Sequence, residues 1–416
     1  MSSKNKALSA NGMAGGGGGK TNNVNNGNNE KGKNNVPQKS KKQSDADEFE
    51  QVLADLNRVT AAVGKQRTKQ QEREDKLRKE KQAVVPGGVR KAKGIDDEFA
   101  TMLRKKQQRQ QFQQFLQQLL AAQSPFLEAP ATEVNCEVSD TNPHFNVAVA
   151  EMQGWRVSME DKHVLDVTFP SGANNSEEGL FCVFDGHSGK DCAIRCSELI
   201  PKVSRNHLKR HVDGFSEIDF EAVYLEVDAL LEGGLSDQSG CTAVSVHVTP
   251  TRITCASVGD SRAVLCRNGA AVALSEDHKP ERAEERARIE AAGGIVSENR
   301  VNGQLAMSRA FGDFSYKAQK TQSPREQLVI TVPDVVKVDR EIGDTFLVLA
   351  CDGIFDVLSN EQLINSVLAK KGENKPNRDI CEEICRECLA PSAEGGRFAA
   401  RPQGTDNMTL MIVDLK

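Results

Sequence analysis

The sequence predicts an α+β domain with antiparallel sheets, preceded by an N-terminal extension of different composition. From about residue 135 onward, short apolar runs alternate with turn residues, which is typical of β-strands. Separate blocks with helical periodicity interrupt these runs. The dipeptide Asn268-Gly269 joins two apolar runs directly, which is a strong signal for a hairpin and therefore for antiparallel pairing.

Six of the apolar runs are predicted strands, and four of the periodic blocks are predicted helices. The strands are expected at residues 180–184, 241–248, 252–257, 262–266, 345–350 and 408–413. The helices are expected at about residues 190–203, 218–232, 281–292 and 360–371. A second hairpin turn is predicted at Gly259-Asp260-Ser261, between two of these strands.

The segment CEEICREC (381–388) suggests two readings. Cys381, Cys385 and Cys388 recur at helical spacing with Ile384 on a similar face, so a packed helix is favoured over a metal site.

The predicted domains are an N-terminal extension over residues 1–135 and the α+β domain over residues 136–416. Residues 1–44 are rich in Gly, Asn and Lys and contain too little apolar surface to fold, so we expect disorder there. Amphipathic helices are expected within 45–82 and 96–123. The second helix either binds a partner or inhibits the domain, or it simply packs on the domain or pairs with the neighbouring helix.

The net charge of −5 is unevenly distributed. Residues 1–135 carry 24 Lys and Arg against 15 Asp and Glu, whereas the remainder carries 30 against 44. A basic tail on an acidic body suggests contact between the two, or a body that attracts cations or basic peptides.

The chain has no run of about 18 apolar residues and no apolar signal-peptide core near its N-terminus, so no membrane span is expected. Its eleven cysteines are scattered, which is typical of reduced thiols in an intracellular protein. KSKK (39–42) and RKAK (90–93) could assist nuclear import, so the expected location is the cytoplasm, the nucleus or both. No P-loop, dinucleotide-binding or nucleic-acid-binding motif is present.

Acidic residues lie at or near the ends of the predicted strands. In FCVFDGHSG (181–189) an apolar run ends at an aspartate that is followed by Gly186 and His187. Each such residue taken alone is consistent with a simple turn. The full set of carboxylates is Glu160, Asp161, Asp185, Asp260, Asp352, Asp356 and Asp406.

Carboxylates that converge at one rim of a sheet would repel each other unless cations lay between them. Ligation by oxygen alone favours Mg²⁺ or Mn²⁺ over zinc. Two such ions about 3.5–4 Å apart bind phosphate and activate a bridging water. Arg156 could then bind phosphate oxygens, and His187 could protonate the leaving alkoxide.

Eight segments in series resemble the protein phosphatase 2C family, the metal-dependent Ser/Thr protein phosphatases. They are GWRVSMED (154–161), FDGHSG (184–189), SGCTA (239–243), SVGDSRAVL (257–265), EDHKP (276–280), LAMSRAFGD (305–313), ACDGIFDVL (350–358) and DNMT (406–409). The resemblance covers about residues 144–415 and implies a central antiparallel β-sandwich flanked by helices, with a binuclear Mg²⁺/Mn²⁺ site at one end.

The resemblance also implies a role for each candidate residue. One ion is expected on the carbonyl of Gly186 together with Glu160 and Asp161, directly or through water, and the other on Asp352 and Asp406, with Asp185 bridging both. Asp260 and Asp356, with Asp352, match a weaker third metal position. Arg156 is expected to bind the phosphoryl group, and His187 to act as the general acid.

The implied reaction is direct attack of metal-activated water on phosphoserine or phosphothreonine in a protein substrate, without a phosphoenzyme. Residues 292–313 correspond to the family's flap beside the site. Two alternatives remain: a non-catalytic phosphatase-like scaffold, and a metal phosphoesterase acting on a small phosphorylated metabolite.

Overall fold

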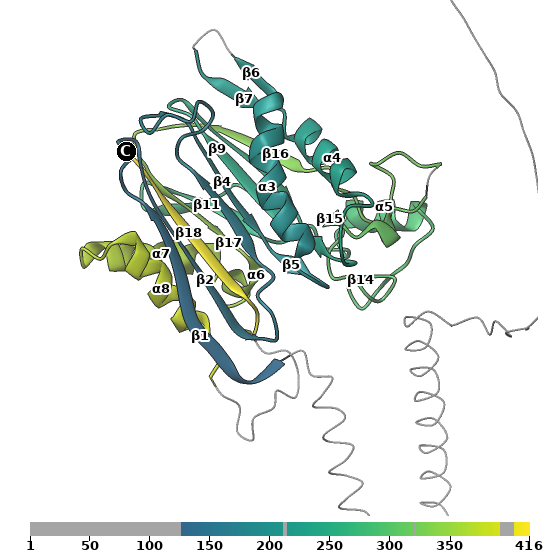
Figure 1. Cartoon of the computed structure of the whole chain (residues 1–416). Helices are drawn as coiled ribbons and strands as arrows, with labels where there is room; N and C mark the ends of the chain where they lie inside the picture. The colour runs from purple at the N-terminus through teal and green to yellow at the C-terminus, as the bar shows by residue number, and fades with distance from the viewer. Residues whose placement is uncertain (1–125, 211–213, 320, 392–402) are drawn as a thin grey trace, which may run out of the picture. The chain divides into compact units, whose positions relative to one another are not determined.

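The computed structural model describes residues 126–210, 214–319, 321–391 and 403–416 (Figure 1). The expected low-complexity segment, the helices within 45–82 and 96–123, and both basic runs lie outside the described residues.

Two antiparallel sheets pack face to face and form a sandwich (Figure 1). This arrangement confirms the expected α+β architecture, a β-sandwich flanked by helices. The six-stranded sheet has the order β1 (Phe126–Ser139), β2 (Phe145–Arg156), β18 (Met408–Leu415), β17 (Asp344–Ala350), β11 (Arg262–Arg267) and β12 (Ala270–Ala273). The five-stranded sheet has the order β16 (Asp334–Asp339), β10 (Arg252–Val258), β9 (Ala243–Val248), β4 (Gly179–Phe184) and β3 (Lys162–Asp166).

Shorter elements surround the sandwich. Two-stranded pairs form from β6 (Leu208–Arg210) with β7 (Ser216–Ile218) and from β13 (Val296–Ser297) with β14 (Arg300–Val301). A small third sheet contains β15 (Phe311–Gly312), β8 (Gly240–Cys241) and β5 (Gly186–His187). The helices are α3 (Asp191–Asn206), α4 (Phe220–Leu231), α5 (Ala283–Ala291), the 3₁₀ turn η1 (Phe314–Tyr316), α6 (Asp352–Phe355), α7 (Asn360–Gly372) and α8 (Asn377–Cys388).

The central strands are apolar on both faces because each face is covered. On β17, Leu347 and Leu349 face the core between the two sheets, whereas Phe346 and Val348 face the helices. Successive side chains on a strand alternate between its faces, so a strand buried on both sides is a continuous apolar run. This is why the apolar run TFLVLA (345–350) predicts a strand from the sequence alone.

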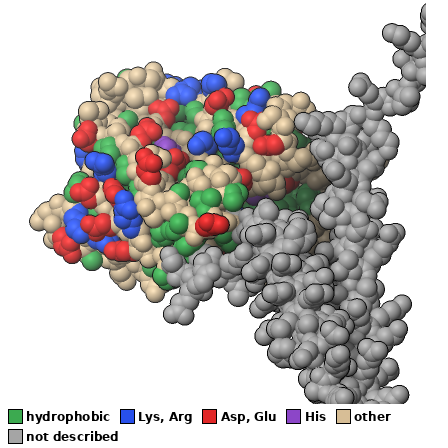
Figure 2. All heavy atoms as spheres, turned by 60° about the horizontal axis from the view of Figure 1, so that its bottom comes forward, with side chains coloured by type: hydrophobic (Ala, Val, Ile, Leu, Met, Phe, Trp, Pro, Cys, Tyr) green, Lys and Arg blue, Asp and Glu red, His purple; other side chains and the backbone are tan. Residues whose placement is uncertain are grey.

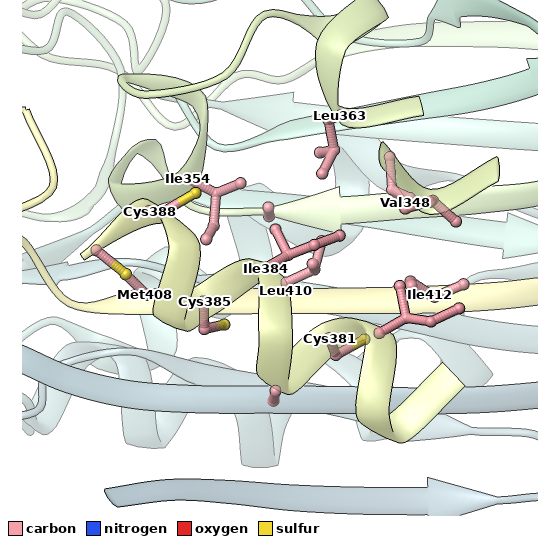
Figure 3. Packing of buried hydrophobic residues seen from close by; sticks show 14 of the residues in the cluster. Val348, Ile354, Leu363, Cys381, Ile384, Cys385, Cys388, Met408, Leu410 and Ile412 are labelled. Carbon is pink, nitrogen blue, oxygen red and sulfur yellow. The ribbon is translucent and has the colours of Figure 1, made fainter. Parts of the chain in front are cut away.

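Helices α7 and α8 cover the outer face of the six-stranded sheet, where α8 packs against β1, β2 and β18 (Figures 1 and 3). Cys381, Ile384, Cys385 and Cys388 point into this layer and are buried, which confirms a packed helix. Ser359 caps α7: its hydroxyl accepts a hydrogen bond from the backbone N–H of Gln362, and the side-chain oxygen of Gln362 accepts one from the Ser359 N–H. Helices α3 and α4 cover the opposite face, on the five-stranded sheet.

The second predicted hairpin was wrong. Residues 259–261 connect β10 of the five-stranded sheet to β11 of the six-stranded sheet, so the two strands do not pair. The turn residues correctly indicated a chain reversal, but a reversal does not determine which sheet the next strand joins. The connection instead carries the chain from one sheet to the other and places Asp260 at one end of the sandwich. The Asn268-Gly269 hairpin, between β11 and β12, is confirmed.

Strand β1 begins at Phe126, so residues 126–135, which were assigned to the extension, belong to the six-stranded sheet. Glu128, Pro130 and Glu133 interrupt this stretch, and most of its side chains are at least partly exposed. An edge strand of this kind has no apolar run that would reveal it.

Acidic and basic side chains are interspersed on the face of the domain seen in Figure 2. Ion pairs are frequent among the described side chains, such as Lys370 with Glu383 at 3.0 Å and with Glu387 at 2.7 Å. Within the described residues, no helix is long and apolar enough to cross a membrane.

Truncating Ile384 to alanine should lower the free energy of unfolding by about 2–5 kcal/mol, because it opens a cavity between α8 and the sheet. Urea unfolding of the full chain measures this change. Glu382→Ala is the matched control, since it removes only a partly exposed ion pair with Arg386 and should cost less than about 1 kcal/mol. Equal effects of the two changes would contradict the assigned packing.

Candidate active site

The predicted acidic residues converge at one end of the sandwich, in the connections at the ends of several strands. Asp185 lies between β4 and β5, and Asp260 lies between β10 and β11. Asp352 opens α6 directly after β17, and Asp406 precedes β18. Glu160 and Asp161 follow β2.

Asp185 is at the centre of this group. Carboxylate oxygens of Asp185, Asp260 and Asp352 all lie within 4.8 Å of one another. On the other side, Asp185 lies within the same distance of Asp161 and of the Cys351 thiol. Asp356 is exposed at the outer side of the group, where its charge raises the pKa of Asp352.

These carboxylates interact unfavourably with one another. Burial and then the charge of Asp352 raise the pKa of Asp185 well above its ordinary value. Burial, together with the charges of Asp260 and Asp406, does the same for the pKa of Asp352. Burial raises the pKa of Asp161 to about 7, although Thr409 Oγ1 donates a 2.7 Å hydrogen bond to its Oδ2. A cluster of this kind is stable as carboxylates only when positive charge is supplied.

Glycines allow the loops of the site to approach each other closely. A Cβ on Gly186 would collide with the carbonyl oxygen of Glu160. A Cβ on Gly353 would collide with the carbonyl oxygen of Asn407, which would push α6 away from the start of β18. The glycine that follows each aspartate in the two Asp-Gly pairs is therefore required by backbone packing.

The loop after β2 is held in place by β18. Asn407 Oδ1 accepts a 2.9 Å hydrogen bond from the Glu160 N–H, and Asn407 Nδ2 donates to the carbonyl of Ser158 at 3.0 Å. The Glu160 carboxylate accepts hydrogen bonds from the Ser158 hydroxyl at 2.7 Å and from the Gly189 N–H at 3.4 Å. Within the described residues, Glu160 does not belong to the close groups around Asp185.

Two cations reach the acidic group. Arg156, at the end of β2, forms an ion pair with Asp406. Lys279 forms an ion pair with Asp260. Burial lowers the pKa of Lys279, but the charge of Asp260 outweighs this effect and holds the pKa above the ordinary value for lysine.

His187 lies beside the group on β5. Its Nε2 is 2.7 Å from Oδ2 of Asp313, which is buried and has left-handed backbone with φ of 50°. Burial lowers the pKa of His187, but the hydrogen bond and charge of Asp313 outweigh it, so the pKa is raised. A Cβ on Gly240 would collide with both side chains, so this residue leaves the space that the pair needs.

The residues fit a cation site. Within the described part of the chain, Oδ1 of Asp161, Oδ1 of Asp260 and Oδ1 of Asp352 are buried and lack a hydrogen-bond partner. Buried oxygens of this type normally have partners, and the adjoining Asp185 carboxylate completes an all-oxygen donor set. Hard divalent cations prefer such donors.

A sequence profile described as protein phosphatase 2C matches residues 145–395. Protein phosphatase 2C homolog 2 of Schizosaccharomyces pombe is 40% identical over 275 residues, which cover 65% of this chain and 72% of that protein. The chain belongs to the protein phosphatase 2C family. It is thus a metal-dependent protein serine/threonine phosphatase, which confirms the family resemblance and the reaction class expected from the sequence.

Other relatives agree. Protein phosphatase 1B of Mus musculus is 38% identical over 308 residues, with 69% of this chain and 74% of that protein covered. A solved structure described as a phosphatase from a pathogenic strain of Toxoplasma gondii superposes with a TM-score of 0.56 at 25% identity, over 68% of this chain and 96% of that one.

Several residues of the phosphatase site had no assigned role from the sequence. Asp313, Lys279 and Asn407 lie inside the recognised segments LAMSRAFGD, EDHKP and DNMT, yet their contacts connect distant parts of the chain. His187 and Asp313 are 126 positions apart. The only sequence signal for these residues was their position within the recognised segments.

Gly353→Ala should reduce phosphate release by this phosphatase strongly, because the new methyl group forces α6 and Asp352 away from Asn407. Release of phosphate from a phosphothreonine peptide measures the effect. Gly372→Ala is the control, since a Cβ there meets nothing within 4 Å, and it should retain the wild-type rate. Wild-type activity in Gly353→Ala would show that this close approach is not needed.

Proposed function

We propose that the enzyme binds two Mg²⁺ or Mn²⁺ ions between its carboxylates and hydrolyses phosphoserine and phosphothreonine in proteins directly, without a phosphoenzyme. The observation that carries this proposal is the close group of Asp185, Asp260 and Asp352, whose oxygens lie within 4.8 Å of one another. Its buried oxygens without partners, among the described residues, are suited to a hard cation.

Asp185 would bridge the two ions. The carbonyl of Gly186, with Glu160 and Asp161, would hold one ion, and Asp352 with Asp406 the other. Asp260 and Asp356 would complete a third, weaker position beside Asp352. When bound, such ions neutralise phosphate oxygens and supply a nucleophilic water near neutral pH.

Arg156 would orient the substrate. Its guanidinium lies at the edge of the acidic group, and its Nε is buried without a partner among the described residues. A planar guanidinium binds two phosphate oxygens at once, which fixes the phosphoryl group for attack from one side.

His187 would protonate the leaving oxygen of serine or threonine. Asp313 fixes the ring through Nε2, and Nδ1 has no partner within the described residues. The Asp313 carboxylate stabilises the protonated imidazole, so His187 can hold at Nδ1 the proton that the alkoxide needs.

The two alternatives are less well supported. A non-catalytic scaffold would not need to retain the carboxylates of a metal site, and here Asp185, Asp352 and Asp406 are all present. A phosphoesterase that acts on a small metabolite would use the same chemistry, but the relatives from Schizosaccharomyces pombe and Mus musculus are named protein phosphatases.

Asp352→Asn should abolish Mn²⁺-dependent phosphate release from a phosphothreonine peptide, a loss of at least about 100-fold, because it removes one charged metal ligand. The assay compares wild type and variant with and without millimolar Mn²⁺. Asn360→Ala is the control and should remain active, because Asn360 is the first residue of α7 and lies outside the carboxylate group. Release by Asp352→Asn at the wild-type rate would contradict the proposed ligand set.

His187→Ala should slow hydrolysis of a phosphothreonine peptide by about 10²–10⁴-fold, because the alkoxide leaves without a proton donor. Hydrolysis of p-nitrophenyl phosphate, whose leaving group needs no proton, should fall much less. The ratio of the two rates is the measurement. A uniform loss on both substrates would argue against a general-acid role.

The basic residues of the N-terminal extension suggest regulation by contact with the acidic catalytic domain or with a protein partner. Removal of residues 1–125, which leaves β1 intact, should then raise turnover at low salt, with the difference shrinking as salt screens the charges. Rates of the full chain and of residues 126–416 on one peptide provide the comparison. Equal rates at low salt would remove the inhibitory interpretation.

A further inference from the structure

Three buried cysteines form a compact group that the phosphatase reaction does not use. Cys192 and Cys196 lie one turn apart on α3, and Cys241 lies on β8. Their sulfur atoms all lie within 4.8 Å of one another, with 3.6 Å from Cys241 to each of the other two. All three side chains are fully buried.

We propose that Cys192, Cys196 and Cys241 form a binding site for a thiophilic divalent ion of the zinc type, chemically distinct from the carboxylate site. Zinc–sulfur bonds of about 2.3 Å in tetrahedral geometry place the sulfur atoms about 3.8 Å apart. The two 3.6 Å separations already match this spacing to a few tenths of an ångström. Thiolate ligands select zinc-type ions over Mg²⁺ and Mn²⁺, so the two sites would not compete for the same metal.

The same spacing is less suitable for a disulfide. A sulfur–sulfur bond is about 2.05 Å long, so one pair of sulfur atoms would have to approach by roughly 1.5 Å inside a packed core. Cys241 is also equidistant from its two neighbours, which favours a shared ligand over one selected pair.

The surroundings favour negative charge at one of the three sulfur atoms, that of Cys192. Burial raises the pKa of Cys196 and of Cys241 well above the ordinary value, so these two thiols would lose their protons only when a cation binds. Cys192 is the second residue of α3, where the helix dipole favours an anion. Hydrogen bonds from Cys196 and Cys241, and more weakly the charge of Lys317, lower the pKa of Cys192 to about 5. Lys317 is in turn held by Asp228, through contacts of 2.7 and 2.9 Å. Three thiolates and a divalent ion would carry one net negative charge beside the N-terminus of α3.

The position of the group links it to the small sheet beside the active site. Cys241 pairs with Gly186 on one side and with Phe311 on the other. Helix α3 contacts all three strands of this sheet, β5, β8 and β15. A bound ion would therefore fasten α3 to β8, the neighbour of the strand β5 that carries Gly186 and His187.

Cadmium titration of the full chain tests the proposal. The thiols are kept reduced, and excess Mg²⁺ is present to occupy carboxylates. We expect an ultraviolet thiolate-to-cadmium charge-transfer band that saturates at one equivalent, and displacement of that band by Zn²⁺. Saturation with Zn²⁺ should raise Tm by roughly 5 °C or more. Carboxylate-bound cadmium gives no such band, so the readout is independent of the catalytic metals.

The variants Cys241→Ser and Cys196→Ser should each reduce the band strongly and abolish the Zn²⁺-dependent rise in Tm. Cys255→Ser is the matched control: it is a buried core cysteine that belongs to no such group within the described residues, and it should keep the band. Circular dichroism verifies that each variant is folded. If one of the two ligand variants misfolds, the other still tests the proposal.

Three results would overturn the proposal. One is the absence of the band in reduced wild-type protein. Another is an unchanged band in both ligand variants. The third is a disulfide between Cys241 and either Cys192 or Cys196, found by mass spectrometry of the purified protein, together with no Cd²⁺ binding after reduction. The cysteines would then form a redox pair.

Discussion

The repulsion between carboxylates at one end of the sandwich is the interaction on which the rest of the structure depends. Asp185 has Asp161 on one side and Asp260 with Asp352 on the other, and Lys279 and Arg156 bring compensating charge through ion pairs. Such a group does not assemble on its own, because each added carboxylate makes ionisation of the others harder. It has to be held by structure whose stability comes from elsewhere. The core between the two sheets and the helix layers on both outer faces supply that stability.

The connections at this end are held by backbone as much as by side chains. Gly186 and Gly353 each lie so close to a neighbouring carbonyl that no Cβ fits, and Asn407 ties the loop after β2 to the start of β18. These contacts hold in place the connections that carry the carboxylates. A site that is built on rigid elements needs little rearrangement when it binds its ligand.

The domain brings together two donor sets of opposite chemical character. The first consists of oxygens, is partly open to solvent, and is suited to hard cations and phosphate. The second consists of three buried sulfur atoms on α3 and β8. The two meet at the ladder between β5 and β8, where Gly186 pairs directly with Cys241. Because hard and soft donors select different ions, neighbouring sites can be occupied independently while sharing one small sheet.

The sequence by itself determined the features that depend on neighbours in the chain. Strands buried on both faces appear as continuous apolar runs, as in TFLVLA, and the cysteines of α8 recur with the period of a helix. The acidic residues could be selected because each follows or precedes such a strand. Only the tertiary structure decided that residues 259–261 cross between sheets, that β1 begins at Phe126, and that His187 meets Asp313. The physical reason is that these outcomes depend on how two sheets stack and which strands become neighbours. That stacking is set by the burial of the whole core rather than by any local pattern.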